Sequence, residues 1–323
     1  MGSNVRRSFG VAGCVASAAA AALVLTACGT SAADETSDSG ASGSGDSGTL
    51  VLASIPSEES QSLQQEYQLV ADVLEKETGL TVEFQNATDY AAVIEAQRAG
   101  KVDIAAYGPF SYVTAKDSGV ATTPIAALVD AEGESPGYES YAITTPGSGI
   151  SSLADFRGKT VCFVDPTSTS GYLYPSAGLI EAGVDPRTDV TPVFAGGHDA
   201  AVLAVVSGQC DAGFAYDTMV DKTLPEKGQI APGDIEVLWK SETIAGSPIA
   251  LSDSLSPELK DQITSIFRDE LNIPNLVAKG YCTDEDSCRL PEASEYGYAA
   301  VDDAFFDGVR KVCEVTEADA CKQ

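Results

Sequence analysis

The sequence is short of positive charge and of histidine. Against 48 Asp and Glu it has only 19 Lys and Arg, giving a formal net charge of −29, and it has one His. A chain this acidic is not expected to bind nucleic acid or an anionic membrane surface. A small anionic ligand remains possible, because local geometry outweighs net charge at short range. With one His and no C-x-x-C pair, we expect no metal site and no other cofactor.

Motifs of the common enzyme classes are also missing. There is no G-x-S-x-G nucleophile elbow and no nucleotide-binding glycine loop. A serine (Ser168 or Ser170), His198 and Asp217 could supply a hydrolase triad, but hydroxyls in a row suit binding better than nucleophilic attack. We therefore expect a protein that is not an enzyme, with a Ser/His hydrolase as the less favoured alternative.

The N-terminus holds the main apolar run. Arg6 and Arg7 precede "VAGCVASAAAAALVL" and then "LTAC", which ends at Cys28. This pattern indicates an export signal and is too short for a good membrane-spanning helix. Because "LTAC" resembles the bacterial lipobox, we expect residues 1–28 to be a lipoprotein signal with lipid on Cys28. An ordinary cleaved signal is the alternative, and the paired arginines leave Sec and twin-arginine export open.

Residues 29–49 contain no large apolar side chain, so they cannot bury a core and are predicted to form a disordered tether. Six cysteines remain beyond the signal and Cys28, and an even number in an exported chain indicates disulfides. Proximity along the chain favours two short pairings, and the two cysteines left over would join neighbouring strands: Cys282–Cys288, Cys313–Cys321 and Cys162–Cys210.

The rest of the chain alternates between strand-like and helix-like segments, which predicts an α/β fold with mostly parallel sheets flanked by helices. Leu63, Tyr67, Val70 and Leu74 fall at helical spacing before Gly79. A second strand–helix series begins near residue 159, in a sheet ordered 2-1-3. Residues 138–145 and 241–252 are predicted to connect two lobes, and the tail from about 255 to be helical. Lobe 1 would span 50–141 plus 247–323, and lobe 2 142–246.

One segment suggests what the lobes bind. In "DPTSTSGYLYP", the hydroxyl residues Ser168, Thr169 and Ser170 lie between a predicted strand and a predicted helix. Helix N-termini carry unpaired N–H groups and partial positive charge, so they suit anions. Simple helix capping by serine is the alternative. "AAYGPFSYV", which contains Tyr107, is a second strand end, and His198 lies at a third helix start. Ligands of open α/β sheets bind at such ends.

Together, "DPTSTSGYLYP", "YGPFSY", "ESPGYESY", "GGHDAAVLAVVSGQCDAG" and "LWKSETIAGSPI" resemble the phosphonate, phosphite and phosphate substrate-binding proteins of ABC importers. The resemblance covers about residues 50–272. It implies a type II periplasmic-binding-protein fold whose ligand lies in the cleft between two closing lobes, and a membrane permease as partner. We expect a monomer that is anchored by lipid to the outer face of the cytoplasmic membrane.

The resemblance also implies roles for single residues. The hydroxyl run would grip the phosphorus oxygens, with Tyr90, Tyr138 and His198 around the same group. A protonated His198 would add a charge-assisted bond. Tyr107 is a further candidate for a ligand-binding residue.

One departure from the family bears on the ligand. Relatives that bind aminoalkylphosphonates hold the ammonium with two carboxylates, and here Ser247 replaces one while Thr218, beside Asp217, stands at the other. Because a buried unpaired charge is costly, we expect a ligand without an amine: phosphite, phosphate or a small alkylphosphonate. Asp217 would then accept a hydrogen bond from a protonated ligand oxygen. Open alternatives are an aminoalkylphosphonate, another oxyanion such as sulfate, nitrate or a sulfonate, a phosphorylated vitamin, and a sensor in place of a transporter.

Overall fold

The computed structural model describes residues 48–322, all within one compact unit of the chain. The predictions for the signal segment, for the lipid on Cys28 and for most of the tether lie outside these residues. None of the helices in residues 48–322 is long and apolar enough to cross a membrane.

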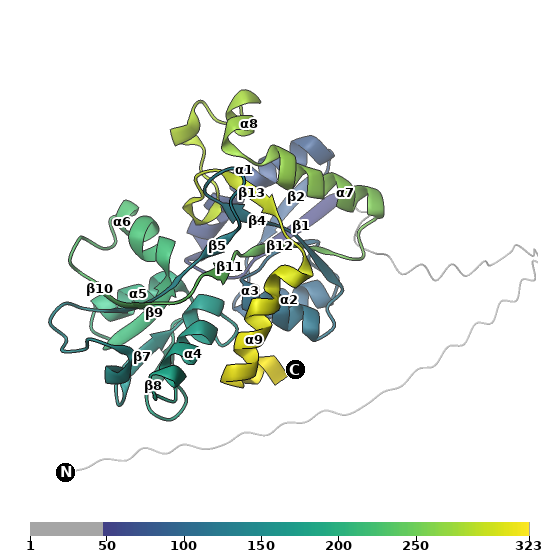
Figure 1. Cartoon of the computed structure of the whole chain (residues 1–323). Helices are drawn as coiled ribbons and strands as arrows, with labels where there is room; N and C mark the ends of the chain where they lie inside the picture. The colour runs from purple at the N-terminus through teal and green to yellow at the C-terminus, as the bar shows by residue number, and fades with distance from the viewer. Residues whose placement is uncertain (1–47, 323) are drawn as a thin grey trace, which may run out of the picture. The chain divides into compact units, whose positions relative to one another are not determined.

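The first lobe is built on a six-stranded sheet (Figure 1). Its strands, in chain order, are β1 (Thr49–Ser54), β2 (Thr81–Gln85), β3 (Ile104–Ala106), β4 (Thr122–Val129), β12 (Pro248–Ser252) and β13 (Gly297–Ala300). Their order across the sheet is β13-β4-β12-β3-β1-β2. The carboxyl end of β1 and the segment after β3 lead toward the second lobe, which places the following residues at the interface between the lobes.

Helices cover both faces of this sheet. They are α1 (Ser60–Thr78), α2 (Tyr90–Arg98), α3 (Pro109–Asp117), α7 (Pro257–Ser265) and α8 (Ile273–Ala278). The predicted apolar stripe of α1 is buried as expected, and it packs with α7 on one face. Side chains of α2 and α3 pack on the other face. Gly79 ends α1 in the left-handed conformation, and Asp89 caps α2 by accepting from the Ala92 N–H.

The second lobe has a five-stranded sheet in the order β10-β6-β9-β7-β8. Its strands are β6 (Ser140–Thr144), β7 (Thr160–Phe163), β8 (Thr191–Phe194), β9 (Ala212–Tyr216) and β10 (Glu236–Lys240), and its helices are α4 (Tyr174–Glu181), α5 (His198–Val206) and the short α6 (Leu224–Glu226). β7 lies between β8 and β9 and is parallel to both. The predicted 2-1-3 order of these strands is therefore confirmed.

The chain passes between the lobes through a two-stranded antiparallel ribbon, β5 (Gly137–Tyr138) with β11 (Ile244–Ala245). Both strands fall in or next to the segments that the sequence indicated as connections. The ribbon matters for the site because Tyr138 and Ser247 lie in it or directly after it.

The prediction of mostly parallel sheets is wrong, although the α/β class is right. β12 runs antiparallel to β3 and β4, and β6 runs antiparallel to β9 and β10. These two strands arrive from the opposite lobe through the ribbon and not through a helical crossover. The right-handed crossover that makes neighbouring strands parallel is therefore missing at these positions.

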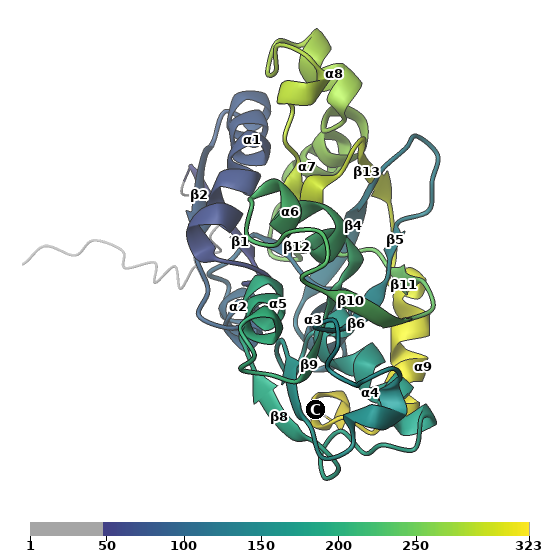
Figure 2. The ribbon, with the colours of Figure 1, turned by 90° about the vertical axis from the view of Figure 1, so that its left-hand side faces the viewer.

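The tail is less helical than the sequence predicted. It contains β13, which extends the first sheet at the edge of β4, before it forms α9 (Asp307–Thr316). Helix α9 contacts α3 of the first lobe, α4 of the second and the ribbon strand β11 (Figure 2). An ion pair of 3.1 Å between Arg310 and Asp117 of α3 supports this placement. Helix α9 therefore lies along the connection between the lobes and contacts both of them.

All three predicted disulfides are present: Cys162–Cys210, Cys282–Cys288 and Cys313–Cys321. The first joins β7 to the residue two positions before β9, in the core of the second lobe, where both cysteines are buried.

The three disulfides are expected to differ in what they contribute to stability. Replacing Cys162 and Cys210 by Ser should lower the free energy of unfolding by about 4 kcal/mol, because the bond links residues 48 positions apart. The matched change at Cys282 and Cys288, only 6 positions apart, should cost about 2 kcal/mol. Urea unfolding of the two double variants measures both losses, and an equal or reversed order would contradict this expectation.

Candidate functional site

A small cavity of about 20 Å³ lies where the two lobes meet. The residues that line it are Ile55, Ser57, Tyr90, Gly108, Tyr138, Ser168, Thr169, Ser170, His198, Tyr216, Ser247 and Glu292. No Lys or Arg is among these lining residues, and Glu292 is their one carboxyl. The cavity is therefore walled mainly by neutral hydrogen-bonding groups.

The starts of helical segments converge on this cavity. Tyr90 is the first residue of α2, and Gly108 is the residue that precedes α3. In the second lobe Ser168 precedes a helical turn, and His198 is the first residue of α5. Each start carries a partial positive charge, although some of the first N–H groups already have protein partners, as the Phe110 N–H has in Thr169 and the His198 N–H in the Ser57 carbonyl. Together they make the cavity attractive to an anion without a cationic side chain.

The predicted hydroxyl run is buried in the wall of the cavity. Ser168 caps a π-helical turn, Thr169–Leu173, by accepting from the Gly171 N–H at 3.1 Å. Such turns occur often at functional sites. Gly171 is required here because a Cβ on it would lie 2.4 Å from the Val164 side chain. Its role is therefore to let the turn approach the end of β7, and not to let the backbone approach a ligand.

Contacts across the cavity hold the lobes together. Thr169 Oγ1 accepts a hydrogen bond of 2.8 Å from the Phe110 N–H of α3. The His198 N–H donates to the Ser57 carbonyl at 2.7 Å. These bonds join lobe 1 to the hydroxyl run and to the start of α5, so the structure represents a closed arrangement.

His198 is neutral, in contrast to the protonated form considered from the sequence. Its Nδ1 accepts a hydrogen bond from the Tyr216 N–H at 3.2 Å, so the proton must be on Nε2. Burial lowers the pKa of His198 to about 3. Nε2 lies 3.5 Å from Ser168 Oγ. The imidazole thus offers one neutral N–H donor to the cavity.

Tyr90 supplies a hydroxyl without a protein partner. The side chain is 1% exposed, and its hydroxyl makes no hydrogen bond of normal length with any described residue, although Ser168 lies near enough to act on it. A buried donor left unpaired costs free energy. Since Tyr90 lines the cavity, this hydroxyl is available for a ligand.

Two predicted site residues, Tyr107 and Asp217, do not line the cavity. The Tyr107 hydroxyl instead donates to Gln97 Oε1 at 3.0 Å in the core of lobe 1. The Asp217 carboxylate accepts from the N–H groups of Glu139 at 3.0 Å and Thr218 at 2.9 Å. Asp217 is therefore occupied in shaping its own loop. Tyr107 and Asp217 follow strands as predicted, but their side chains turn away.

Several lining residues were not predicted, and Glu292 is the most unexpected. It lies in a short turn after the Cys282–Cys288 loop, beyond the part of the chain that resembled the family. Ser57 follows β1, and Tyr216 ends β9, next to His198. Ser57 and Tyr216 could have been suspected from their places at strand ends. Glu292 has no local pattern that marks it, because its position depends on long-range packing.

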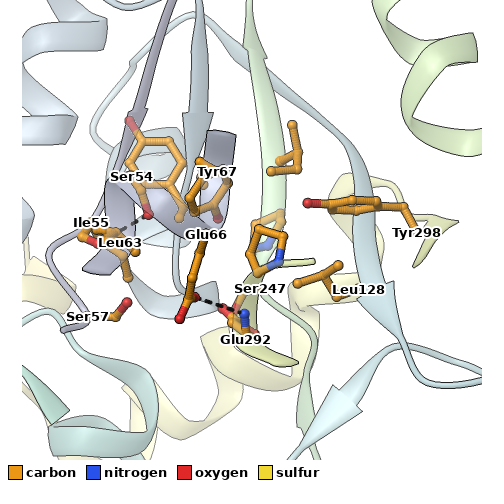
Figure 3. A pocket seen from close by; sticks show the side chains of 15 residues that line it. Ser54, Ile55, Ser57, Leu63, Glu66, Tyr67, Leu128, Ser247, Glu292 and Tyr298 are labelled. Carbon is orange, nitrogen blue, oxygen red and sulfur yellow. Dashed lines mark hydrogen bonds between the residues drawn. The ribbon is translucent and has the colours of Figure 1, made fainter. Parts of the chain in front are cut away.

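A second, smaller cavity continues from the first and shares Ile55, Ser57, Ser247 and Glu292 with it (Figure 3). Here Glu66 of α1 accepts from the Glu292 N–H at 3.4 Å. Burial and the neighbouring Glu58 raise the pKa of Glu66 to about 8. Lys227 of lobe 2 pairs with Glu58 and lies 3.6 Å from Glu66. This ion pair closes the lobes over the acidic side of the site.

The neutrality of His198 has a measurable effect on stability. Because the folded pKa of about 3 lies below the ordinary value of 6.5, protons bind the unfolded chain better. The contribution of neutral His198 to the free energy of unfolding is complete above pH 6.5. It is lost as the pH falls toward 3, by about 1.4 kcal/mol per pH unit. Without ligand, the wild type should therefore lose about 2 kcal/mol more than His198→Gln between pH 6.5 and 5. Urea unfolding at both pH values measures this difference, and parallel losses would refute a neutral, buried His198.

Comparison with known proteins agrees with this geometry. Residues 52–272 match the protein family described as "ABC transporter, phosphonate, periplasmic substrate-binding protein". The chain is 46% identical over 313 residues to the phosphate-import protein PhnD of Mycolicibacterium smegmatis, across 94% of this chain and 96% of that protein.

Solved structures show the same fold. A binding protein component of an ABC phosphonate transporter from Pseudomonas aeruginosa superposes with a TM-score of 0.71 at 28% identity, covering 83% of this chain and 86% of that one. PhnD1 from Prochlorococcus marinus, in complex with methylphosphonate, gives 0.72 at 19% identity, covering 84% and 98%. The predicted type II periplasmic-binding-protein fold is confirmed. The chain belongs to the phosphonate periplasmic substrate-binding proteins of ABC transporters.

Proposed function

We propose that this protein binds a small phosphorus oxyanion (phosphate, phosphite or a small alkylphosphonate) between its lobes and delivers it to an ABC permease. The observation that carries the proposal is the closed cavity of neutral donors around Ser168, Thr169 and Ser170. A tetrahedral oxyanion has oxygens pointing in several directions, and here donors come from both lobes.

The names of similar proteins support the same class of ligand. One relative is named as a phosphate-import protein, and one structural neighbour was solved with methylphosphonate. The two positions that hold an ammonium group in relatives offer no free carboxylate here, because one is Ser247 and Asp217, beside the other, is occupied by two backbone N–H groups. An aminoalkylphosphonate is therefore disfavoured at these positions, and Glu292 is the one carboxyl that lines the cavity.

The mechanism that we propose is closure without chemistry. Thr169 and Phe110, together with Lys227 and Glu58, join the lobes after the ligand has entered. The permease would open the lobes by breaking these contacts. Hydrolysis is disfavoured because His198 Nδ1 accepts from a backbone N–H, whereas a triad needs it to donate to a carboxylate.

The proposed location and membrane attachment of the protein come from its sequence. We propose that it acts outside the cytoplasmic membrane as a monomer, held by lipid on Cys28 through the tether. The location and the lipid anchor rest on the lipobox-like "LTAC" and on the composition of residues 29–49.

Calorimetry on the chain from residue 48 tests the proposed ligand class. Phosphate, phosphite or methylphosphonate should bind more tightly than 2-aminoethylphosphonate and sulfate. Ser170→Ala should weaken this binding by about 1–3 kcal/mol, because a buried anion loses a donor. If no phosphorus compound binds, the hydroxyl run acts only as a helix cap and the proposal fails.

A pair of tyrosines separates ligand binding from folding. Tyr90→Phe removes a hydroxyl with no protein partner, so it should weaken phosphate binding by about 1–2 kcal/mol without loss of stability. Tyr107→Phe breaks the bond to Gln97 and should lower stability by about 1–2 kcal/mol with unchanged affinity. Thermal unfolding and calorimetry on both variants check this. The opposite assignment would show that Tyr107, and not Tyr90, faces the ligand.

A further inference from the structure

One carboxyl group lies in a cavity that otherwise offers neutral groups. Glu292 lines the same small space as Tyr90, Tyr138 and the hydroxyl run. It reaches this space from the turn Pro291–Ala293 of lobe 1, opposite the donors of lobe 2. An anion bound to the hydroxyls would therefore have a carboxyl group as a close neighbour.

The backbone holds Glu292 in this place under strain. Glu292 and Ala293 have φ values of 57° and 53°, in the left-handed region that disfavours residues other than glycine. Three hydrogen bonds fix the turn: the Glu292 N–H to Glu66 at 3.4 Å, the Ser294 hydroxyl to the Val129 carbonyl at 2.8 Å, and the Glu295 N–H to Asp130 at 3.0 Å. The turn is thus anchored to α1 and to the end of β4, with its carboxyl group in the cavity.

The surroundings of Glu292 contain more acid than base. The charged and titratable groups that act on it or respond to it from the packed elements are Glu58, Glu66, Asp130, Asp217, Tyr67, Tyr90, Tyr138, Tyr216 and Tyr298. Lys227 is a cation of this cluster, but it pairs with Glu58 and Glu66. Burial, with a smaller contribution from nearby carboxylates, raises the pKa of Glu292 to about 7, although a hydrogen bond from Ser247 partly offsets the rise.

We propose that Glu292 determines the specificity of this site by accepting a hydrogen bond from a protonated oxygen of the ligand. This inference rests on the proposed function and narrows it. The ligand oxygen keeps its proton and donates it to a Glu292 carboxylate oxygen, so that one proton lies between two groups that would otherwise repel each other. The other ligand oxygens accept from Ser168, Thr169, Ser170 and the remaining neutral donors. The site therefore selects a phosphorus oxyanion that still carries a proton.

Phosphate and sulfate make the distinction measurable. Between pH 7.5 and 9 both are mainly tetrahedral dianions, but hydrogen phosphate carries a proton and sulfate carries none. Sulfate can bind only if Glu292 takes a proton from water. Above a pKa of about 7, sulfate affinity should fall about tenfold per pH unit relative to phosphate. Changes at Glu66 act on two ligands of equal charge and should cancel in the ratio.

The experiment is calorimetry of residues 48–322 with phosphate, and displacement of phosphate by sulfate, between pH 7.5 and 9. In the wild type, the ratio of the sulfate Kd to the phosphate Kd should rise about 30-fold over this range. In Glu292→Gln the ratio should be flat, and sulfate at pH 9 should bind at least about tenfold more tightly than in the wild type. The matched control is Asp217→Asn, which removes a nearby charge outside the cavity and should keep the wild-type slope.

Each other result has a distinct meaning. A flat ratio in the wild type, with phosphate bound, would overturn the role of Glu292 while leaving the proposed function standing. A slope abolished by Asp217→Asn instead would move that role to Asp217. Loss of 2-aminoethylphosphonate binding alone in Glu292→Gln would show that Glu292 pairs with an ammonium group. Absence of any phosphorus ligand in the wild type would defeat the proposed function itself. The wild-type measurement needs no variant, so a folding defect in Glu292→Gln would not protect the proposal.

Discussion

The proposed function places one electrostatic constraint on the structure: an anion must be held in a closed cavity that no cationic side chain lines. Charge on the ligand can then be balanced only by hydrogen bonds and by the partial positive charge of helix starts. Such donors act over short distances, so they must be placed accurately and water must be excluded. The convergence of Tyr90, Gly108, Ser168 and His198 at four helical starts meets this requirement.

In the proposed mechanism, opening and closing of the two lobes makes this arrangement reversible. The set of donors is complete only when lobe 1 covers the donors of lobe 2. Hydrogen bonds such as that from the Phe110 N–H to Thr169 Oγ1 then join the two lobes. Tyr138, in the connecting ribbon, lines the same cavity. Ligand contacts, interlobe contacts and the connection between lobes therefore share residues, which links occupancy of the site to closure. The acidic surface of the chain does not oppose this, because the groups that line the cavity are neutral except for Glu292.

Much of this site could be predicted from local sequence. The hydroxyl run and His198 mark themselves by lying between a strand and a helix, and the strand order predicted the Cys162–Cys210 pair. Side-chain direction could not be predicted in this way: Tyr107 follows a strand as expected, yet its hydroxyl turns to Gln97. The antiparallel placement of β12 and the position of Glu292 depend on contacts between segments far apart in the chain. The tautomer of His198 depends on the Tyr216 N–H, a single backbone group.

The central claim is that neutral donors from both lobes surround a phosphorus oxyanion at the hydroxyl run. A crystal structure of the protein with phosphate tests this most directly. The account predicts one phosphate ion in the cavity, with its oxygens within hydrogen-bond distance of Ser168, Thr169 and Ser170 and of the Tyr90 hydroxyl. A phosphate ion bound elsewhere on the protein, with this cavity left to water, would contradict it.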